Sequence, residues 1–372
     1  MTPEGTKAGN TAVDEKLMKA LNSAVDKIRQ DHGEGAVMDM SAKPKAVDSI
    51  PTGSLPLDIA LGIGGIPEGR IVEIFGPESS GKTTLCYHMM AEVQRRGQIA
   101  AFIDTEHAMD AKYASDLGVD IPALVVSQPD YGEQALQIVE VLANSSAVSL
   151  IVVDSVAALT PKSEIDGQIG DSSVGVLARL MSQACRKLAG VANRNNVTIV
   201  FTNQIREKIG VMFGSPETQP GGRALKFYSS QRLDIRRIET IKDAGDAVAN
   251  RVRVKVVKNK VAPPFTQAEF EIAYGKGVDK NGALLDFCTD KSNPVDLVTK
   301  AGAFYTFTTT GEKAQGAAKA KAYLAEHPEI AEEIDTAVRA FYFPEDSDEE
   351  GPADDSEAIA AEVDAEDAEK EV

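Results

Sequence analysis

The sequence predicts an α/β fold in which a mostly parallel, twisted sheet is flanked by helices. Between residues 46 and 280, short β-branched runs alternate with longer amphipathic stretches, the order expected when helices cover a parallel sheet. A glycine-rich loop joins one such run to the next amphipathic stretch. The composition, 43% hydrophobic and 26% charged, is that of an ordinary globular protein.

Five short runs are predicted to be buried parallel strands, because each is almost continuously apolar. They cover residues 70–75, 99–104, 123–127, 149–154 and 197–202. Three further runs follow with no long helix between them, at 231–238, 251–257 and 268–273. We expect these three to form an antiparallel extension of the same sheet.

Composition divides the chain into four predicted segments, with the ranges 1–45, 46–280, 281–344 and 345–372. They correspond to an amphipathic helix with its linker, the α/β core, a small separate α/β lobe, and an acidic tail. The tail is too poor in apolar residues to fold. In the small lobe, helices are predicted at 313–324 and 328–341.

The amphipathic helix is predicted over residues 12–31, where apolar side chains recur at helical spacing in an otherwise charged segment. These side chains are Leu17, Leu21, Val25 and Ile28. Such a helix needs a surface to dock on. The pattern leaves docking on its own core and docking on a second subunit open, with a slight preference for its own core.

The net charge of -18 does not exclude a nucleic-acid partner, because most of it lies at one end. Residues 345–372 hold 14 acidic residues and one lysine, whereas residues 251–260 carry five positive charges that can form a local basic surface. No apolar run is long enough to cross a membrane and no secretory signal is visible, so we expect a cytoplasmic protein. The three cysteines are scattered, which favours reduced thiols.

Residues 76–83 read GPESSGKT and match the phosphate-loop pattern G-x-x-x-x-G-K-[ST] between a predicted strand and a predicted helix. In such a loop, backbone N–H groups and the lysine hold nucleotide phosphates, and the final hydroxyl binds Mg²⁺. A chance glycine turn is the alternative, which the flanking strand and helix disfavour. The predicted nucleotide contacts are Gly76, Pro77, Glu78, Ser79, Ser80, Gly81, Lys82, Thr83 and Thr84. The sequence therefore predicts ATP with Mg²⁺.

Acidic residues end two of the predicted parallel strands, whose carboxyl ends meet at one edge of a sheet. Asp154 ends the run 149–154 and is predicted to hold the metal together with Thr83; Ser155 is a candidate support for this carboxylate. Glu106 follows the run 99–104 and is assigned to orient and deprotonate the attacking water. A capping role at the next helix is the alternative for Glu106, and Asp104 is predicted to be structural.

With these motifs, the sequence resembles the bacterial RecA family of DNA recombinases over residues 12–343. Besides the phosphate loop, the shared motifs are FIDTEHA at 102–108, LIVVDSVAAL at 150–159, TNQIR at 202–206, GVMFG at 210–214 and KVVKNK at 255–260. The resemblance implies a fold built on the RecA-type ATPase core.

For the ATP site, the resemblance implies that Tyr113 stacks on the adenine and that Asp110 hydrogen-bonds its edge. It makes Gln204 the γ-phosphate sensor at the head of a DNA-binding loop. It also implies that Lys258 and Lys260 reach the ATP of the adjoining subunit. The predicted catalytic group is Glu106, Lys82, Gln204, Lys258 and Lys260. By pattern alone, residues 251–260 are a basic strand edge, and Gln204 can be a turn cap.

Two glycine-containing loops, 164–172 and 205–223, are implied to bind single-stranded DNA, with the helix after the first loop adding arginines. The predicted DNA contacts are Ile165, Gly167, Gly170, Ser172, Val174, Arg179, Arg186, Arg206, Lys208, Ile209, Gly210, Phe213, Gly221, Gly222 and Arg223. Ile209 and Val174 are the implied wedges between bases. The chain departs from better-known sequences at Ser173-Val174, Glu207 and Pro220, which affects the details of base contact.

The resemblance implies a DNA-dependent ATPase that forms helical filaments on single-stranded DNA, pairs it with a homologous duplex, and exchanges strands in recombinational repair. It also implies that the filament promotes self-cleavage of the SOS repressor. The N-terminal helix would dock on the next subunit. The small lobe, with Lys300, Lys313, Lys319 and Lys321, would gather double-stranded DNA, and the acidic tail would compete with DNA or simply aid solubility.

Two other functions remain compatible with the same core. A ring-forming helicase would couple hydrolysis to translocation in closed hexamers. A nucleotide-gated binding module would bind DNA or a partner with negligible turnover.

Overall fold

The structure is a computed structural model that describes residues 15–33, 36–37, 47–168, 175–207, 216–243, 245–290 and 295–344. The chain forms two compact units, residues 1–46 and residues 47–372. In the first unit, the predicted amphipathic helix is α1 (Glu15–His32), on which Leu17, Leu21 and Ile28 are exposed. Three of the four apolar side chains that define the predicted face are therefore exposed, and Val25 is half-buried.

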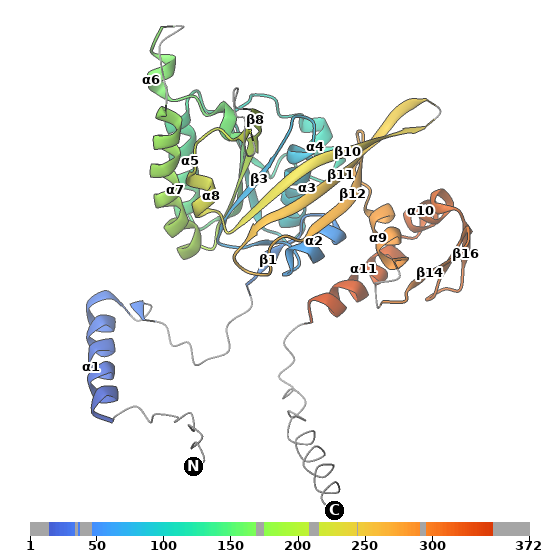
Figure 1. Ribbon diagram of the computed structural model, residues 1–372, viewed down its shortest axis with the longest axis horizontal. Coiled ribbons are helices and arrows are strands. Elements are labelled where there is room, and N and C mark those ends of the chain that lie inside the picture. Colours follow the sequence, from blue (N-terminus) through green and yellow to red (C-terminus); the bar gives the residue numbers. More distant parts are fainter. Residues whose placement is uncertain are drawn as a thin grey trace, which may run out of the picture. The chain divides into compact units, whose positions relative to one another are not determined.

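The second unit is built on a nine-stranded sheet with the order β13-β12-β11-β10-β3-β7-β6-β4-β5. Figure 1 shows β3, β10, β11 and β12 side by side in this sheet. Its strands are β3 (Ile71–Gly76), β4 (Ile99–Asp104), β5 (Val125–Ser127), β6 (Val148–Asp154), β7 (Thr198–Gln204), β10 (Gln231–Asp243), β11 (Asp246–Asn259), β12 (Gln267–Ala273) and β13 (Gly277–Val278). Strands β5, β4, β6, β7, β3 and β10 pair in parallel. Strands β10 to β13 pair antiparallel, so the predicted α/β sheet with its antiparallel extension is confirmed.

Helices cover both faces of this sheet, because alternate residues of its central strands point to opposite sides. On one face, Val72 and Ile74 pack with Leu85 of α3 (Lys82–Arg95). On the other face, Ile71 packs with side chains of α5 (Gly132–Asn144) and α7 (Val176–Arg194). Both layers are buried, which holds the carboxyl ends of the parallel strands rigidly at one edge.

Shorter elements connect these layers. They are β1 (Ser49–Ile50), α2 (Leu55–Leu61), β2 (Ile66–Pro67), α4 (Ala111–Asp116), η2 (Val156–Ala158), α6 (Lys162–Ile165), β8 (Arg206–Glu207), β9 (Glu217–Thr218) and α8 (Ala224–Tyr228). Among the residues described, no helix has the length and apolar character needed to cross a membrane.

The C-terminal part contains a three-stranded sheet and three helices, whose apolar cluster also includes Leu55 of α2. The elements are α9 (Lys280–Cys288), β14 (Val298–Ala301), β15 (Phe304–Phe307), β16 (Lys313–Gln315), α10 (Ala317–Glu326) and α11 (Pro328–Tyr342). The helix predicted over 313–324 is wrong at its start. Lys313–Gln315 pairs with β15 as a strand, and Gly316 with φ 85 separates this strand from α10.

A buried ion pair joins α11 to the main part of this unit. Asp58 of α2 is fully buried and accepts 2.8 Å hydrogen bonds from the Arg339 guanidinium and from the backbone amide of Thr52. Burial raises the pKa of Asp58 to about 6, although Arg339 and Thr52 act in the opposite direction. The interactions with Arg339 and Thr52 thus compensate only in part for the hydration that the ionised carboxylate loses on burial.

This ion pair predicts a pH dependence of stability. Because the pKa of Asp58 is raised from 3.8 to about 6, the folded chain holds this proton more tightly than the unfolded chain. Its contribution to stability therefore falls as pH rises from about 4 to about 6, by at most roughly 3 kcal/mol. Urea unfolding of the chain and of Asp58→Asn across this range measures the effect. If the difference in the free energy of unfolding between the two proteins did not change with pH, the raised pKa of Asp58 would be contradicted.

Candidate nucleotide site and nucleic-acid surface

The phosphate loop lies between β3 and α3 and is wrapped around Lys82. The Lys82 Nζ donates hydrogen bonds to the carbonyl oxygens of Gly76 at 3.2 Å and Pro77 at 2.7 Å. A Cβ atom on Gly76 would lie 2.1 Å from the carbonyl oxygen of Ile235, and Gly81 has φ +100. Glycine is therefore required at both ends, and the loop presents the N-terminal end of α3 to an anion.

Asp154 lies at the end of β6, directly beside the start of α3. The Thr83 hydroxyl donates to its Oδ2 at 2.6 Å, and the Thr202 hydroxyl donates to its Oδ1. Burial raises the pKa of the Asp154 carboxyl, and these two hydroxyl groups oppose that rise. A hydroxyl and a carboxylate in direct contact are the donor set that Mg²⁺ uses beside a nucleotide, so Thr83 and Asp154 fit this metal.

Glu106 and Gln204 come from the ends of β4 and β7 and meet at the same edge of the sheet. The Gln204 side-chain amide donates to Glu106 Oε1 at 3.2 Å, and the Ser155 hydroxyl donates to the same oxygen at 2.5 Å. The suggestion that Ser155 supports Asp154 is therefore wrong. Ser155 orients the Glu106 carboxylate instead.

Asp104 holds the segment that carries Glu106. It is buried and accepts hydrogen bonds from the backbone amides of Ala108 at 3.2 Å and Met109 at 3.1 Å. The side-chain amide of Gln128 donates at 2.9 Å. These bonds fix the chain between Glu106 and Asp110, as the structural role predicted for Asp104 requires.

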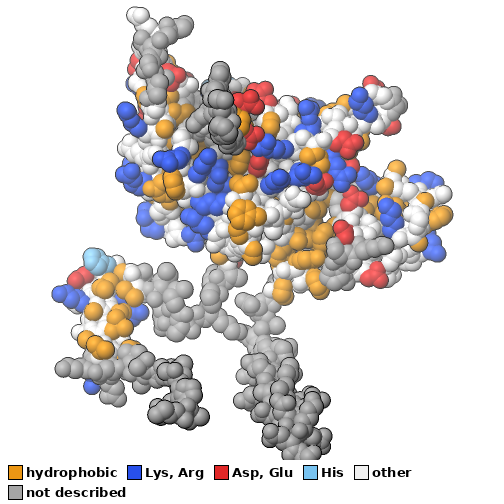
Figure 2. Space-filling model, viewed as in Figure 1, with side chains coloured by type: hydrophobic (Ala, Val, Ile, Leu, Met, Phe, Trp, Pro, Cys, Tyr) orange, Lys and Arg blue, Asp and Glu red, His pale blue; other side chains and the backbone are white. Residues whose placement is uncertain are grey.

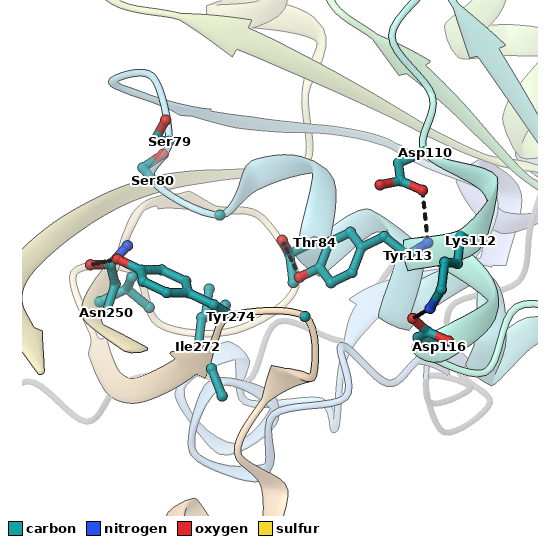
Figure 3. Close-up of a pocket in the computed structure, with 14 residues that line it drawn as sticks. Ser79, Ser80, Thr84, Asp110, Lys112, Tyr113, Asp116, Asn250, Ile272 and Tyr274 are labelled. Atoms are coloured by element: carbon teal, nitrogen blue, oxygen red, sulfur yellow. Dashed lines mark hydrogen bonds and ion pairs between the residues drawn. The ribbon is translucent and has the colours of Figure 1, made fainter. Parts of the chain in front are cut away.

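A cavity of about 510 Å³ opens beside the phosphate loop (Figure 3). Its lining includes the predicted contacts Ser79, Ser80, Gly81, Thr84, Asp110 and Tyr113. The Tyr113 hydroxyl lies 3.1 Å from the Thr84 hydroxyl, and the Tyr113 backbone amide donates to Asp110 at 2.9 Å. The aromatic ring is thus fixed relative to α3, which begins in the phosphate loop.

The lining of the same cavity also includes residues that were not predicted from the sequence, among them Asn250 of β11 and Tyr274, which follows β12. The Tyr274 hydroxyl donates to Asn250 Oδ1 at 3.0 Å, and Figure 3 shows this pair on the side of the cavity opposite Tyr113. These residues belong to the antiparallel extension and match no local motif. Only the pairing of the strands brings them to the cavity.

Lys258 and Lys260 lie at the end of β11 against the C-terminal end of α8. The Lys258 Nζ donates to the carbonyl oxygens of Lys226 at 2.7 Å and Phe227 at 2.9 Å, and the Lys260 Nζ donates to Phe227 at 3.5 Å. Burial and the nearby positive charges of Lys260 and Arg232 lower the pKa of Lys258 to about 8. Neither lysine lines the cavity that holds Tyr113.

The predicted DNA contacts are only partly described. Seven lie outside the described residues, namely Gly170, Ser172, Val174, Lys208, Ile209, Gly210 and Phe213. Ile165 ends α6 with half of its surface exposed, and Gly167 follows it. Arg179 and Arg186 are exposed on α7. Arg206 of β8 pairs with Thr218 of β9, which closes the base of the second loop.

The end of the second loop packs against the core immediately before α8, where Arg223 is exposed. Gly221 and Gly222 have φ values of +79 and +73, and a Cβ atom on either would lie 2.9 Å from Val156 or Ala178, respectively. Both glycines are therefore needed for close approach to η2 and α7. This packing is a reason for glycine that the sequence reasoning, which considered only phosphate contacts, did not include.

Basic side chains gather over α7 and α8 on the face that Figure 2 shows. In the C-terminal lobe, one of the four lysines predicted to gather duplex DNA is engaged differently. The Lys321 Nζ forms ion pairs with Asp279 at 2.5 Å and Glu271 at 3.3 Å. Lys321 therefore attaches α10 to the main sheet.

The fold and this site define a nucleotide-binding α/β protein of the phosphate-loop ATPase class. The family model "RecA N-terminal domain" matches residues 19–279, and "RecA C-terminal domain" matches residues 282–342. The chain is 54% identical to Protein RecA of Clostridioides difficile (strain 630) over 352 residues, which cover 94% of this chain and 100% of the relative. It is 58% identical to Protein RecA of Clavibacter michiganensis subsp. michiganensis (strain NCPPB 382) over 322 residues, 86% of this chain and 88% of the relative. The chain belongs to the RecA family.

Proposed function

We propose that this chain is a DNA-dependent ATPase that forms helical filaments on single-stranded DNA and catalyses homologous pairing and strand exchange in recombinational repair. The contact between Glu106 and Gln204 is the observation that carries this proposal. It connects the carboxylate that would activate water with the residue at the head of the loop that would bind DNA.

ATP would bind with its phosphates on the loop from Gly76 to Thr83 and its base in the cavity beside Tyr113. Lys82 and the N-terminal end of α3 would neutralise the phosphates. Tyr113 and Tyr274 lie on two sides of the cavity, as expected for rings that contact the faces of a base. The Asp110 carboxylate would accept a hydrogen bond from the adenine amino group.

Hydrolysis requires a base beside the γ-phosphate, and Glu106 would be that base. The hydrogen bonds from Ser155 and Gln204 orient its carboxylate, so it can take the proton of the attacking water. Thr83 and Asp154 would hold Mg²⁺, which supplies charge neutralisation at the phosphates. Gln204 would then respond to the presence or loss of the γ-phosphate.

The ATP site would be completed by the next subunit in a filament. Lys258 and Lys260 would leave the carbonyl oxygens of α8 and reach the neighbour's phosphates, and α1 would dock its exposed apolar face on an adjoining copy. The loops 164–172 and 205–223 would hold single-stranded DNA, and the small lobe would gather duplex DNA. The filament would also present a surface on which the SOS repressor cleaves itself.

Phosphate release with and without single-stranded DNA tests this function. We expect DNA to stimulate hydrolysis strongly, and electron micrographs of protein, ATP, Mg²⁺ and single-stranded DNA to contain open helical filaments. Closed rings would favour a helicase motor. Turnover that single-stranded DNA does not change would contradict the proposal.

A further inference from the structure

An ion pair between Glu73 of β3 and Arg232 of β10 is buried inside the main sheet, apart from the residues assigned to ATP or DNA. The two residues are direct partners in the parallel pairing of these strands, with Arg232 Nε 2.5 Å from Glu73 Oε2. The side chain of Glu73 is only 1% exposed, and that of Arg232 is 11% exposed. The guanidinium also lies over the Phe75 ring, 4.7 Å from its centroid.

Arg232 binds a residue at the end of the second loop, and Glu73 binds the residue beside Gln204, the predicted γ-phosphate sensor. Arg232 Nη2 donates to Gln219 Oε1 at 2.8 Å. Asn203 Nδ2 donates to Glu73 Oε1 at 3.1 Å and to the carbonyl oxygen of Pro220 at 3.2 Å. Asn203 Oδ1 in turn accepts the backbone amide of Gln204 at 3.0 Å.

These bonds form one continuous path. It runs from Glu106 through Gln204 and Asn203 to Glu73, Arg232 and Gln219. Every step is a hydrogen bond of 3.2 Å or less. The path begins at the γ-phosphate edge of the sheet and ends on the segment that leads back from the second loop into α8.

We propose that Glu73, Arg232 and Gln219 are positioning residues that transmit the state of the ATP site to the second DNA loop. This inference rests on the proposed function of the two sites. A buried ion pair adds little net stability compared with apolar side chains of similar volume. Inside the sheet, however, the low dielectric constant strengthens the attraction between the two side chains, and the neighbouring hydrogen bonds fix their geometry. When Gln204 is displaced, Asn203 is displaced with it. Because Asn203 is bonded to this rigid ion pair and not to solvent, the displacement is transmitted to the pair.

The chain provides a matched control on the same strand. Arg236, also in β10, binds Glu217 of the same loop end through two hydrogen bonds of 2.8 and 2.7 Å. This second attachment is exposed at the surface and lies outside the path from Glu106. Loss of Arg236 loosens the loop end, whereas loss of Gln219 both loosens it and interrupts the path.

The test compares Gln219→Ala with Arg236→Ala. Gln219 is partly exposed, so its replacement leaves the core intact. For each full-length protein, the dissociation constant for a fluorescent single-stranded oligonucleotide is measured without nucleotide and with a slowly hydrolysed ATP analogue. The dissociation constant without nucleotide divided by the constant with the analogue reports the coupling between the sites.

We expect Gln219→Ala to reduce this ratio about tenfold, within the usual size of such couplings. Arg236→Ala should keep the wild-type ratio. An unchanged ratio in Gln219→Ala overturns the inference, as does an equal reduction of the ratio in both variants. If the wild-type protein itself shows no nucleotide effect on DNA affinity, the proposed function fails rather than the path alone.

Discussion

Replacement of Glu106 by glutamine is expected to lower the rate of ATP hydrolysis by about 10²–10⁴-fold while ATP binding persists. Glutamine keeps the shape of the side chain and an oxygen that can accept from Ser155, but it cannot take a proton from water. The cavity beside Tyr113 does not include Glu106, so nucleotide affinity should change little.

Phosphate release at saturating ATP and single-stranded DNA measures the rate, and equilibrium binding of a fluorescent ATP analogue measures the affinity. Ser155→Ala is a useful companion, because it removes one hydrogen bond to Glu106 and should have a smaller effect. Undiminished turnover in Glu106→Gln would assign the activation of water to another group.

Replacement of Lys258 by alanine is expected to reduce DNA-stimulated hydrolysis by about 10³–10⁵-fold, the contribution of a cation supplied from a neighbouring subunit. The isolated chain should still bind ATP, because Lys258 binds the carbonyl oxygens of Lys226 and Phe227 and does not line the nucleotide cavity. The loss should therefore appear in turnover and not in nucleotide affinity.

Lys242→Ala is the matched control, since it removes the same charge from an exposed position on β10. Phosphate release and nucleotide binding are measured for both variants. If Lys258→Ala hydrolysed ATP as fast as the control, the assignment of this lysine to a neighbour's phosphates would be wrong.

Local patterns were sufficient to predict the sheet and the phosphate side of the site. Each parallel strand is a short apolar run, and the loop at 76–83 matches a motif whose glycines are required for steric reasons. The carboxyl ends of parallel strands share one edge, so Asp154 and Glu106 could be placed near the loop from sequence alone. These features depend on residues that lie close together in the chain.

Features that depend on long-range pairing could not be predicted in this way. Asn250 and Tyr274 reach the cavity only because β11 and β12 fold back beside the phosphate loop. The hydrogen bond from Ser155 to Glu106 depends on how two strands end side by side. Periodicity also could not separate β16 from α10, because three residues are too few to establish a strand pattern.

We propose that ATP lies between two copies of this chain, with Glu106 from one copy and Lys258 from the next. Mixing Glu106→Gln with Lys258→Ala tests this arrangement, since each variant alone lacks one of the two groups. In a randomly mixed filament, about a quarter of the head-to-tail interfaces would combine the intact Glu106 of one variant with the intact Lys258 of the other. We expect an equal mixture to recover about that fraction of wild-type hydrolysis on single-stranded DNA. A mixture no more active than the two variants measured separately would contradict it.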